Sequence, residues 1–211
     1  MTMDTRPVEN FTAEDFRRRA VHEQAPHGVE LGDHTLNPGL KDLILGQKLR
    51  DAAVLVPVVD RPQGATLLLT RRTDTMRNHS GQIAFPGGRI DPDDGSPEDA
   101  ALRETDEEIG LKRGFINLAG RMPDYVTGSG YRIAPVLATV RPGFSLTINP
   151  DEVDEAFEVP LEFLMDPANH RRDSRIWQDR ERFFHTMPYG ERYIWGITAG
   201  MIHMLYERLY A

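Results

Sequence analysis

The segment from Ser96 to Gly110 constrains the fold more than any other part of the chain, because both of its ends carry helix signals. Serine accepts hydrogen bonds from the first backbone N–H groups of a helix, and Pro97 suits the first helical position. Glycine is the preferred residue just beyond a helix end, where the backbone turns left-handed. The sequence therefore predicts a helix over 97–109 that Gly110 closes.

The side chains of this helix divide into two neighbouring arcs at about 100° per residue. One arc suits packing on a sheet and consists of Ala101, Leu102, Thr105 and Ile109. The other arc carries three carboxylates, Glu104, Glu107 and Glu108, at the margin of the packing face. Like charges at this spacing repel one another, and a hard divalent cation reverses the sign of that energy. The arc therefore indicates a metal site, with a solvated acidic helix face as the alternative.

The rest of the chain alternates between strand and helix patterns, which favours an α/β or α+β sandwich. Residues 1–50 are expected to form an N-terminal extension packed on a domain that spans 51–211. Expected strands are 53–59, 65–71, 83–85, 117–123, 132–140, 144–148, 153–159, 182–187 and 192–195. Expected helices, besides 97–109, are 12–22, 160–165 and 197–209.

Composition narrows the class of partner. The chain has 211 residues, a formal net charge of −8 and no cysteine, so disulfides and thiolate metal sites are excluded. The longest apolar run is far too short to span a bilayer and the first residues show no secretory signal, so we expect a cytoplasmic enzyme without a membrane partner. An acidic chain also repels nucleic acid, and it binds anionic phosphates only through bound cations or a local basic cluster.

Residues 88–111 resemble the Nudix box. They run Gly88-x5-Asp94-x8-Arg103-Glu104-Thr105-x-Glu107-Glu108-x-Gly110-Leu111. The usual pattern is Gly-x5-Glu-x7-Arg-Glu-U-x-Glu-Glu-x-Gly-U, with U aliphatic or similar. Aspartate stands here in place of the first glutamate, and one extra residue separates it from the arginine. These departures leave the role of Asp94 open, whereas the Arg-Glu, Glu-Glu and Gly core is intact.

The resemblance implies the Nudix fold, an α/β/α sandwich with a mixed β-sheet between helices. It implies that Glu104 and Glu108 are the principal ligands of Mg²⁺ or Mn²⁺, and that Glu107 shares the metal cluster or helps to activate water. The carbonyl group of Gly87 is a further candidate ligand. Arg103 completes the expected catalytic set as a residue that braces a loop or carboxylate beside the metal.

A cluster of cationic side chains precedes the box, within residues 68–88. Its candidates for binding substrate phosphates are Arg71, Arg72, Arg77 and His79. The run resembles the second signature of the coenzyme A pyrophosphatase branch of the Nudix family, with Thr73 in place of serine and Met76 in place of leucine. The longer box loop with aspartate is similar to that branch too. A polar strand end followed by a solvated loop is the alternative interpretation of the cluster.

The two resemblances together imply hydrolysis of the diphosphate of coenzyme A or its derivatives, which gives 3′,5′-ADP and 4′-phosphopantetheine. Metal would neutralise the diphosphate, and a carboxylate would accept the proton of the attacking water. Glu107, Glu152 and Glu155 are candidates for that carboxylate, although the last two equally suit a solvated turn and strand. One of the arginines at 71, 72 and 77 is expected to hold the 3′-phosphate.

Two alternatives stay open on the sequence. The first is a Nudix hydrolase that acts on another nucleotide, such as ADP-ribose, NADH or a nucleoside triphosphate. The second is a non-catalytic Nudix domain that senses a nucleotide, against which the intact glutamates count. All three hypotheses share a small nucleotide as partner, and association into a homodimer is left open.

Overall fold

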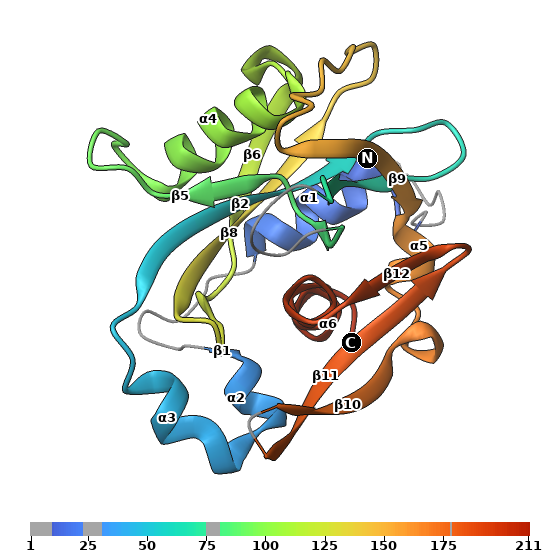
Figure 1. Cartoon of the computed structure of the whole chain (residues 1–211). Coiled ribbons are helices and arrows are strands. Elements are labelled where there is room, and N and C mark those ends of the chain that lie inside the picture. Colours follow the sequence, from blue (N-terminus) through green and yellow to red (C-terminus); the bar gives the residue numbers. More distant parts are fainter. Residues whose placement is uncertain (1–9, 23–30, 75–80, 178) are drawn as a thin grey trace.

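A computed structural model of the chain describes residues 10–22, 31–74, 81–177 and 179–211 (Figure 1). Within these residues a nine-stranded mixed sheet has the main path β1-β7-β8-β2-β3-β4, and β5, β6 and β9 pair with β2, β8 and β3. Its strands are β1 (Leu31–Gly32), β2 (Arg50–Val59), β3 (Thr66–Arg72), β4 (Ile83–Ala84), β5 (Gly87–Arg89), β6 (Ile116–Arg121), β7 (Tyr125–Val126), β8 (Tyr131–Val140) and β9 (Val153–Pro160).

The long strands β2 and β8 run parallel to each other, and β3 runs antiparallel to β2. Successive side chains of a strand point to opposite faces of its sheet. On β2, Ala53 and Leu55 join one buried cluster, whereas Val56 and Val58 join another. Both faces of the sheet centre are therefore covered, which explains why this strand is apolar almost throughout.

Helices form a layer on each side of the sheet (Figure 1). On one side lies α4 (Pro97–Ile109), whose Ala101 and Leu102 pack with Ala53 of β2. The main core lies on the other side, where α1 (Ala13–His22) and α6 (Ile197–Leu209) cover the sheet. The expected α/β/α sandwich with a mixed sheet is confirmed.

A small antiparallel sheet lies beside α6 and consists of β10 (Arg171–Trp177), β11 (Arg180–Tyr189) and β12 (Arg192–Trp195). In Figure 1 it follows the orange and red part of the chain. The short helices are α2 (Asp33–Leu36), α3 (Lys41–Leu45) and α5 (Leu161–Leu164), with 3-10 turns η1 (Pro38–Leu40), η2 (Arg113–Phe115) and η3 (Pro167–Asn169).

The predicted helices over 97–109 and 197–209 begin and end at the predicted residues. The strand expected over 144–148 is wrong, because the backbone there serves the end of α4: the Thr147 N–H donates to the Ile109 carbonyl at 2.9 Å. Strands β1, β5, β7 and β10 were not expected. The division of the chain after residue 50 stays a prediction.

Candidate active site

Gly88, the first residue of the box, and Gly87 before it lie on β5, beside the glutamate-bearing face of α4. The Gly87 N–H donates to Glu108 Oε2 at 3.1 Å. At Gly88, an added Cβ atom would lie 2.4 Å from Glu104 Oε2, which is closer than two such atoms approach. Glycine at position 88 therefore lets the strand backbone and a carboxylate share this space.

Helix α4 has a capping residue at each end. Ser96 Oγ accepts from the Asp99 N–H at 3.1 Å, as the sequence predicted. Gly110 has a φ of 68°, the left-handed conformation that ends the helix. The caps fix where the helix begins and ends, and the packing of Ala101 and Leu102 on the sheet sets which of its side chains face β5.

Burial sets the electrostatics of the two carboxylates that face β5. Glu108 has 3% of its side chain exposed, and this burial raises its pKa to about 7 despite the Gly87 N–H and Arg72 beside it. Glu104 is 17% exposed, and burial raises its pKa as well, despite its hydrogen bond to Arg103. Carboxyl groups that are withdrawn from water in this way ionise most readily when a cation lies beside them.

Arg103 ties the box loop to the glutamates. Its Nε and Nη2 atoms donate to the two carboxylate oxygens of Asp94 at 3.0 and 2.9 Å. Its Nη1 atom donates to Glu104 and to Glu107, each at 3.0 Å. The hydrogen bonds from Arg103 also lower the pKa of Asp94. The aspartate whose role the box pattern left open is thus the anchor of this arginine.

The three box glutamates differ in their surroundings. Glu107 is 56% exposed and shares the guanidinium of Arg103. Within the described residues, no group of three or more His, Cys, Asp or Glu side chains converges closely enough to hold a metal ion. Glu104 and Glu108 nevertheless fit a hard divalent cation, because they are carboxylates partly withdrawn from water whose pKa burial raises. Ligation by Glu107 and by the Gly87 carbonyl stays a prediction.

Another carboxylate reaches the site from the loop before β9. The Asn149 N–H donates to the Glu108 carbonyl at 2.9 Å, which ties this loop to the end of α4. The Asn149 Nδ2 atom donates to Glu152 Oε1 at 3.2 Å. The charge of Glu152 acts on the pKa values of both Glu104 and Glu108, raising them. Glu152 is thus the candidate whose charge reaches both Glu104 and Glu108, while Glu107 acts on Glu104, and the identity of the proton acceptor stays a prediction.

The other two candidates have arginine partners. Glu107 is held by Arg103. Glu155 pairs with Arg192 and lies 3.8 Å from the Nε atom of Arg71. Arg71 also pairs with Asp154, so this predicted phosphate-binding residue faces the acidic side chains of β9.

Arg72 is the predicted phosphate-binding residue that reaches the glutamates. Its Nη1 atom lies 3.7 Å from Glu108 Oε1. Arg77 and His79 lie outside the described residues.

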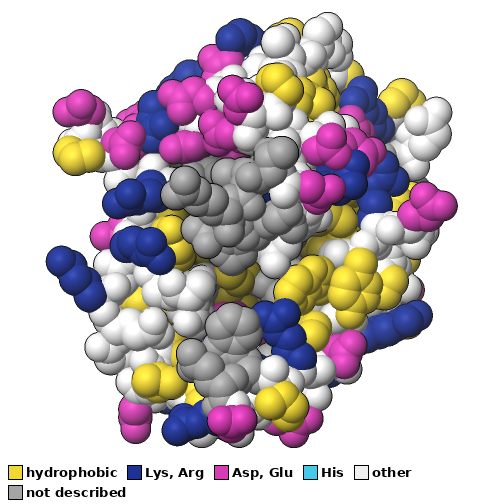
Figure 2. Space-filling model, in the orientation of Figure 1, with side chains coloured by type: hydrophobic (Ala, Val, Ile, Leu, Met, Phe, Trp, Pro, Cys, Tyr) yellow, Lys and Arg dark blue, Asp and Glu magenta, His cyan; other side chains and the backbone are white. Residues whose placement is uncertain are grey.

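A cavity of about 550 Å³, which we call the proximal cavity, opens beside β5. Arg72, Gly87 and Gly88 line one part of it, and Tyr131 and Met201 line another. Acidic side chains gather on the surface over α4 in Figure 2. The site thus combines buried carboxylates, an arginine and space for a small molecule with an apolar part.

The comparison with known families decides which class of protein this site belongs to. The NUDIX domain model matches residues 49–180. The chain belongs to the Nudix family. It is a Nudix hydrolase, an enzyme of the class that acts on nucleoside diphosphate derivatives.

Curated relatives of this Nudix hydrolase include proteins described as uncharacterized Nudix hydrolase NudL. The protein from Photorhabdus laumondii is 41% identical over 167 residues, which cover 78% of this chain and 88% of that protein. The protein from Yersinia pestis is 38% identical over 161 residues, covering 76% of this chain and 80% of that protein. The described residues hold no helix that is long and apolar enough to cross a membrane.

Among solved structures, the Nudix hydrolase RenU from M. smegmatis has a TM-score of 0.46 and 24% identity, covering 54% of this chain and 71% of that chain. A MutT/nudix family protein from Enterococcus faecalis has a TM-score of 0.46 and 16% identity, covering 82% of this chain and 70% of that chain.

Two features of the site were not expected from the sequence. Asp94 was left without a role, although aspartate in a loop before an arginine-bearing helix is a common signal for an ion pair. The proximal cavity also has residues of α6 in its wall, and no local pattern connects Met201 with the box at 88–111.

Proposed function

We propose that this Nudix hydrolase cleaves the diphosphate bond of coenzyme A or its derivatives. One observation carries the proposal: Arg72, from the run that resembles the coenzyme A signature, lies 3.7 Å from Glu108 of the box. The residues of the two motifs therefore meet at one place. An arginine beside the metal-binding carboxylates suits a substrate with a phosphate next to the one under attack.

The reaction adds one water molecule across the P–O–P anhydride. The water oxygen bonds to one phosphorus atom, and the bridging oxygen leaves with the other phosphate. The products are 3′,5′-ADP and 4′-phosphopantetheine. A bound Mg²⁺ or Mn²⁺ supplies charge neutralisation and lowers the pKa of water. Glu104 and Glu108 are the residues that would hold the ion, because they are the two withdrawn carboxylates that face β5.

The remaining polar residues have separate tasks in this proposal. Glu152, half-buried beside the two ligands, accepts the proton of the attacking water. Arg72 donates to the phosphate oxygens. Arg103 is a positioning residue that holds Glu104, and Asp94 holds Arg103 in turn.

The proximal cavity supports a substrate with a sizeable organic part. Its wall includes Phe85, Ile133 and Met201 as well as the glycines of β5. An apolar wall next to a phosphate site suits the pantetheine arm, which carries methyl and methylene groups between its amides.

A substrate panel tests the proposal. With Mg²⁺, we expect kcat/KM for coenzyme A to exceed the values for ADP-ribose, NADH and nucleoside triphosphates by about tenfold or more. Glu104→Gln should lower kcat by about a hundredfold or more, since even residues behind a metal ligand cost about 10- to 100-fold. The matched control is Glu98→Gln, which removes the same charge from the first turn of α4.

Two outcomes would contradict the proposal. Faster cleavage of ADP-ribose or NADH would assign the enzyme to another nucleoside diphosphate derivative. Nucleotide binding without any cleavage in Mg²⁺ or Mn²⁺ would favour the sensing domain. A cytoplasmic location and association into a homodimer stay predictions.

A further inference from the structure

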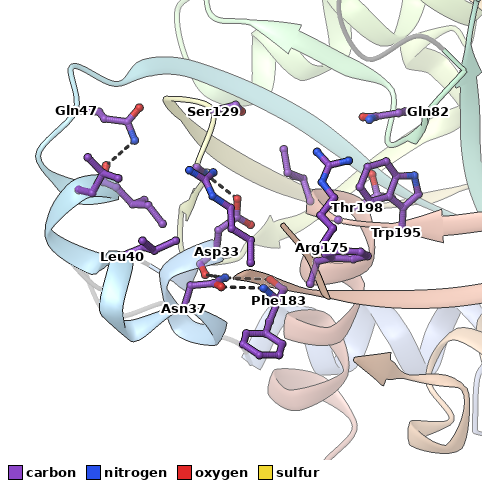
Figure 3. Close-up of a pocket in the computed structure, with 17 residues that line it drawn as sticks. Asp33, Asn37, Leu40, Gln47, Gln82, Ser129, Arg175, Phe183, Trp195 and Thr198 are labelled. Carbon is purple, nitrogen blue, oxygen red and sulfur yellow. Dashed lines mark hydrogen bonds between the residues drawn. The ribbon is translucent and has the colours of Figure 1, made fainter. Parts of the chain in front are cut away.

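Figure 3 shows the residues that line a second cavity of about 550 Å³, which we call the distal pocket. Gln82, Ser129, Ile197 and Thr198 line both cavities. The distal pocket therefore continues the proximal cavity beyond the residues of β5. Its other walls come from the segment 33–47 and from the small sheet β10–β12.

Two arginines form a like-charged pair in this wall. Arg175 of β10 is the direct cross-strand partner of Arg182 on β11. Like charges in this position destabilise a sheet unless an anion offsets them. Arg182 has such an anion in Asp33: burial raises the pKa of Asp33, and the charge of Arg182 counteracts that rise. Asp33 is the one acidic residue among those that line the pocket. The lining thus carries one net positive charge, in a chain whose net charge is −8.

An aromatic ring lies beside one of these arginines, Arg175. The guanidinium of Arg175 is 5.2 Å from the ring centre of Trp195, and Figure 3 shows the two side chains next to each other. The ring of Phe184 packs edge-on against Trp195 with centres 5.5 Å apart. A flat ring beside a guanidinium suits an aromatic base that carries a phosphate nearby, because the base stacks and the phosphate accepts hydrogen bonds.

Hydrogen bonds between distant segments hold the pocket in shape. The side-chain amide of Asn37 donates to the Phe183 carbonyl at 3.0 Å and accepts from the Phe183 N–H at 2.9 Å. Asp33 accepts from the Gly128 N–H at 2.7 Å and from the Tyr125 hydroxyl at 3.0 Å. A site that is rigid before its ligand arrives loses less entropy on binding.

We propose that the distal pocket binds the phosphorylated nucleoside end of the substrate. The base stacks on Trp195, and the phosphate on the sugar accepts hydrogen bonds from Arg175 and Arg182. The inference rests on the proposed function and deepens it, since it places the 3′-phosphate of coenzyme A in the distal pocket. Arg175 and Arg182 thus take the task that the sequence assigned to one of the arginines at 71, 72 and 77, of which Arg71 pairs with Asp154 and lies near Glu155.

Kinetics with two substrates test this placement. Coenzyme A and 3′-dephospho-coenzyme A differ only in the phosphate that the pocket is assigned to hold. Arg175→Gln and Arg182→Gln should each raise KM for coenzyme A about tenfold, the effect of one charge-assisted hydrogen bond, with kcat unchanged. KM for the dephospho form should change less than about twofold.

A matched control separates this effect from a general loss of positive charge. Arg180 lies on the same strand as Arg182, is exposed and does not line the pocket. Arg180→Gln should leave both KM values unchanged. Equal rises in KM for the two substrates in the Arg175 and Arg182 variants would overturn the placement, as would no rise at all.

A binding measurement separates failure of the inference from failure of the proposed function. The chain has two tryptophans, so Trp177→Phe leaves Trp195 as the single one. In this variant, 3′,5′-ADP should quench the fluorescence at a concentration about tenfold lower than 5′-AMP, and Arg175→Gln should remove the difference. This result would support the placement even if coenzyme A were not cleaved. No quenching, or equal quenching by both nucleotides, would overturn it even if coenzyme A were cleaved.

Discussion

Glu108 shows how a functional residue is set up at the scale of one side chain. It is 3% exposed, and this burial raises its pKa from 4.5 to about 7. A carboxylate in such a place is costly for folding and useful for holding a cation, because the ion supplies what the lost water supplied. We therefore expect the free energy of unfolding of the metal-free protein to depend on whether Glu108 is ionised.

The raised pKa predicts the direction of the pH effect. Below pH 4.5 the carboxyl is protonated in both the folded and the unfolded chain, and its contribution to stability is fully present. As pH rises through about 7, the unfolded chain gains more by ionising, so the folded protein loses roughly 3 kcal/mol. Glu108→Gln lacks this loss. We expect urea unfolding in the presence of a chelator to measure this effect. The free energy of unfolding of the variant minus that of wild type should be roughly 2 kcal/mol larger at pH 8 than at pH 5.

Glu107→Gln is the control for this measurement, because it removes a charge from the same helix at a side chain that is 56% exposed. A pH-independent difference between Glu108→Gln and wild type would contradict the account of the buried carboxylate.

At the scale of elements, β5 and α4 work as a unit whose two glycines have different tasks. A Cβ at Gly88 would meet the carboxylate of Glu104, the far end of a flexible side chain. A Cβ at Gly87 would lie 2.4 Å from the backbone carbonyl oxygen of Ala53, and the φ of Gly87 itself is +149°. Gly88 thus shapes the site, and Gly87 permits the strand pairing.

Alanine substitutions should separate these tasks. Gly88→Ala should keep the free energy of unfolding within about 1 kcal/mol of wild type but lower kcat about tenfold or more, because Glu104 must move. Gly87→Ala should lower that free energy by about 2 kcal/mol or more, because the backbone itself must shift. Urea unfolding and steady-state kinetics on the same preparations measure both. A stable, fully active Gly88→Ala would contradict the proposed role of Glu104.

Elements were predictable from the sequence where their signals are local. The ends of α4 follow from Ser96 and Gly110, which cap the helix through contacts within a few residues. Residues 144–148 have strand propensity, but their hydrogen bonds go to the end of α4, which propensity cannot reveal. Strand β10 is rich in charged residues, and only its pairing with β11 makes it a strand.

At the scale of the whole molecule, the proximal cavity and the distal pocket depend on contacts between distant parts of the chain. The carboxylate pair at 104 and 108 was predictable, because helical spacing brings it together. The distal pocket was not, because Asn37 meets Phe183 across 146 positions of sequence. The first helix belongs to the same whole, since Phe16 is fully buried in the main core.

Removing the buried side chain of Phe16 tests how much the N-terminal part of the chain contributes to stability. Phe16→Ala should lower the free energy of unfolding by about 3–5 kcal/mol, the usual cost of emptying a phenylalanine site in a core. Val21→Ala is the control, because Val21 on the same helix is 55% exposed. A single urea transition is expected for both variants. A loss below about 1 kcal/mol for Phe16→Ala would contradict the packing of residues 1–50 on the domain.

The proposed reaction requires that the glutamates of α4 and Arg72 act together on coenzyme A. The most direct measurement is the product profile from coenzyme A with Mg²⁺, resolved by chromatography. We expect 3′,5′-ADP and 4′-phosphopantetheine in equal amounts, and no products with Glu108→Gln. Intact coenzyme A after prolonged incubation, or equal turnover by Glu108→Gln, would contradict it.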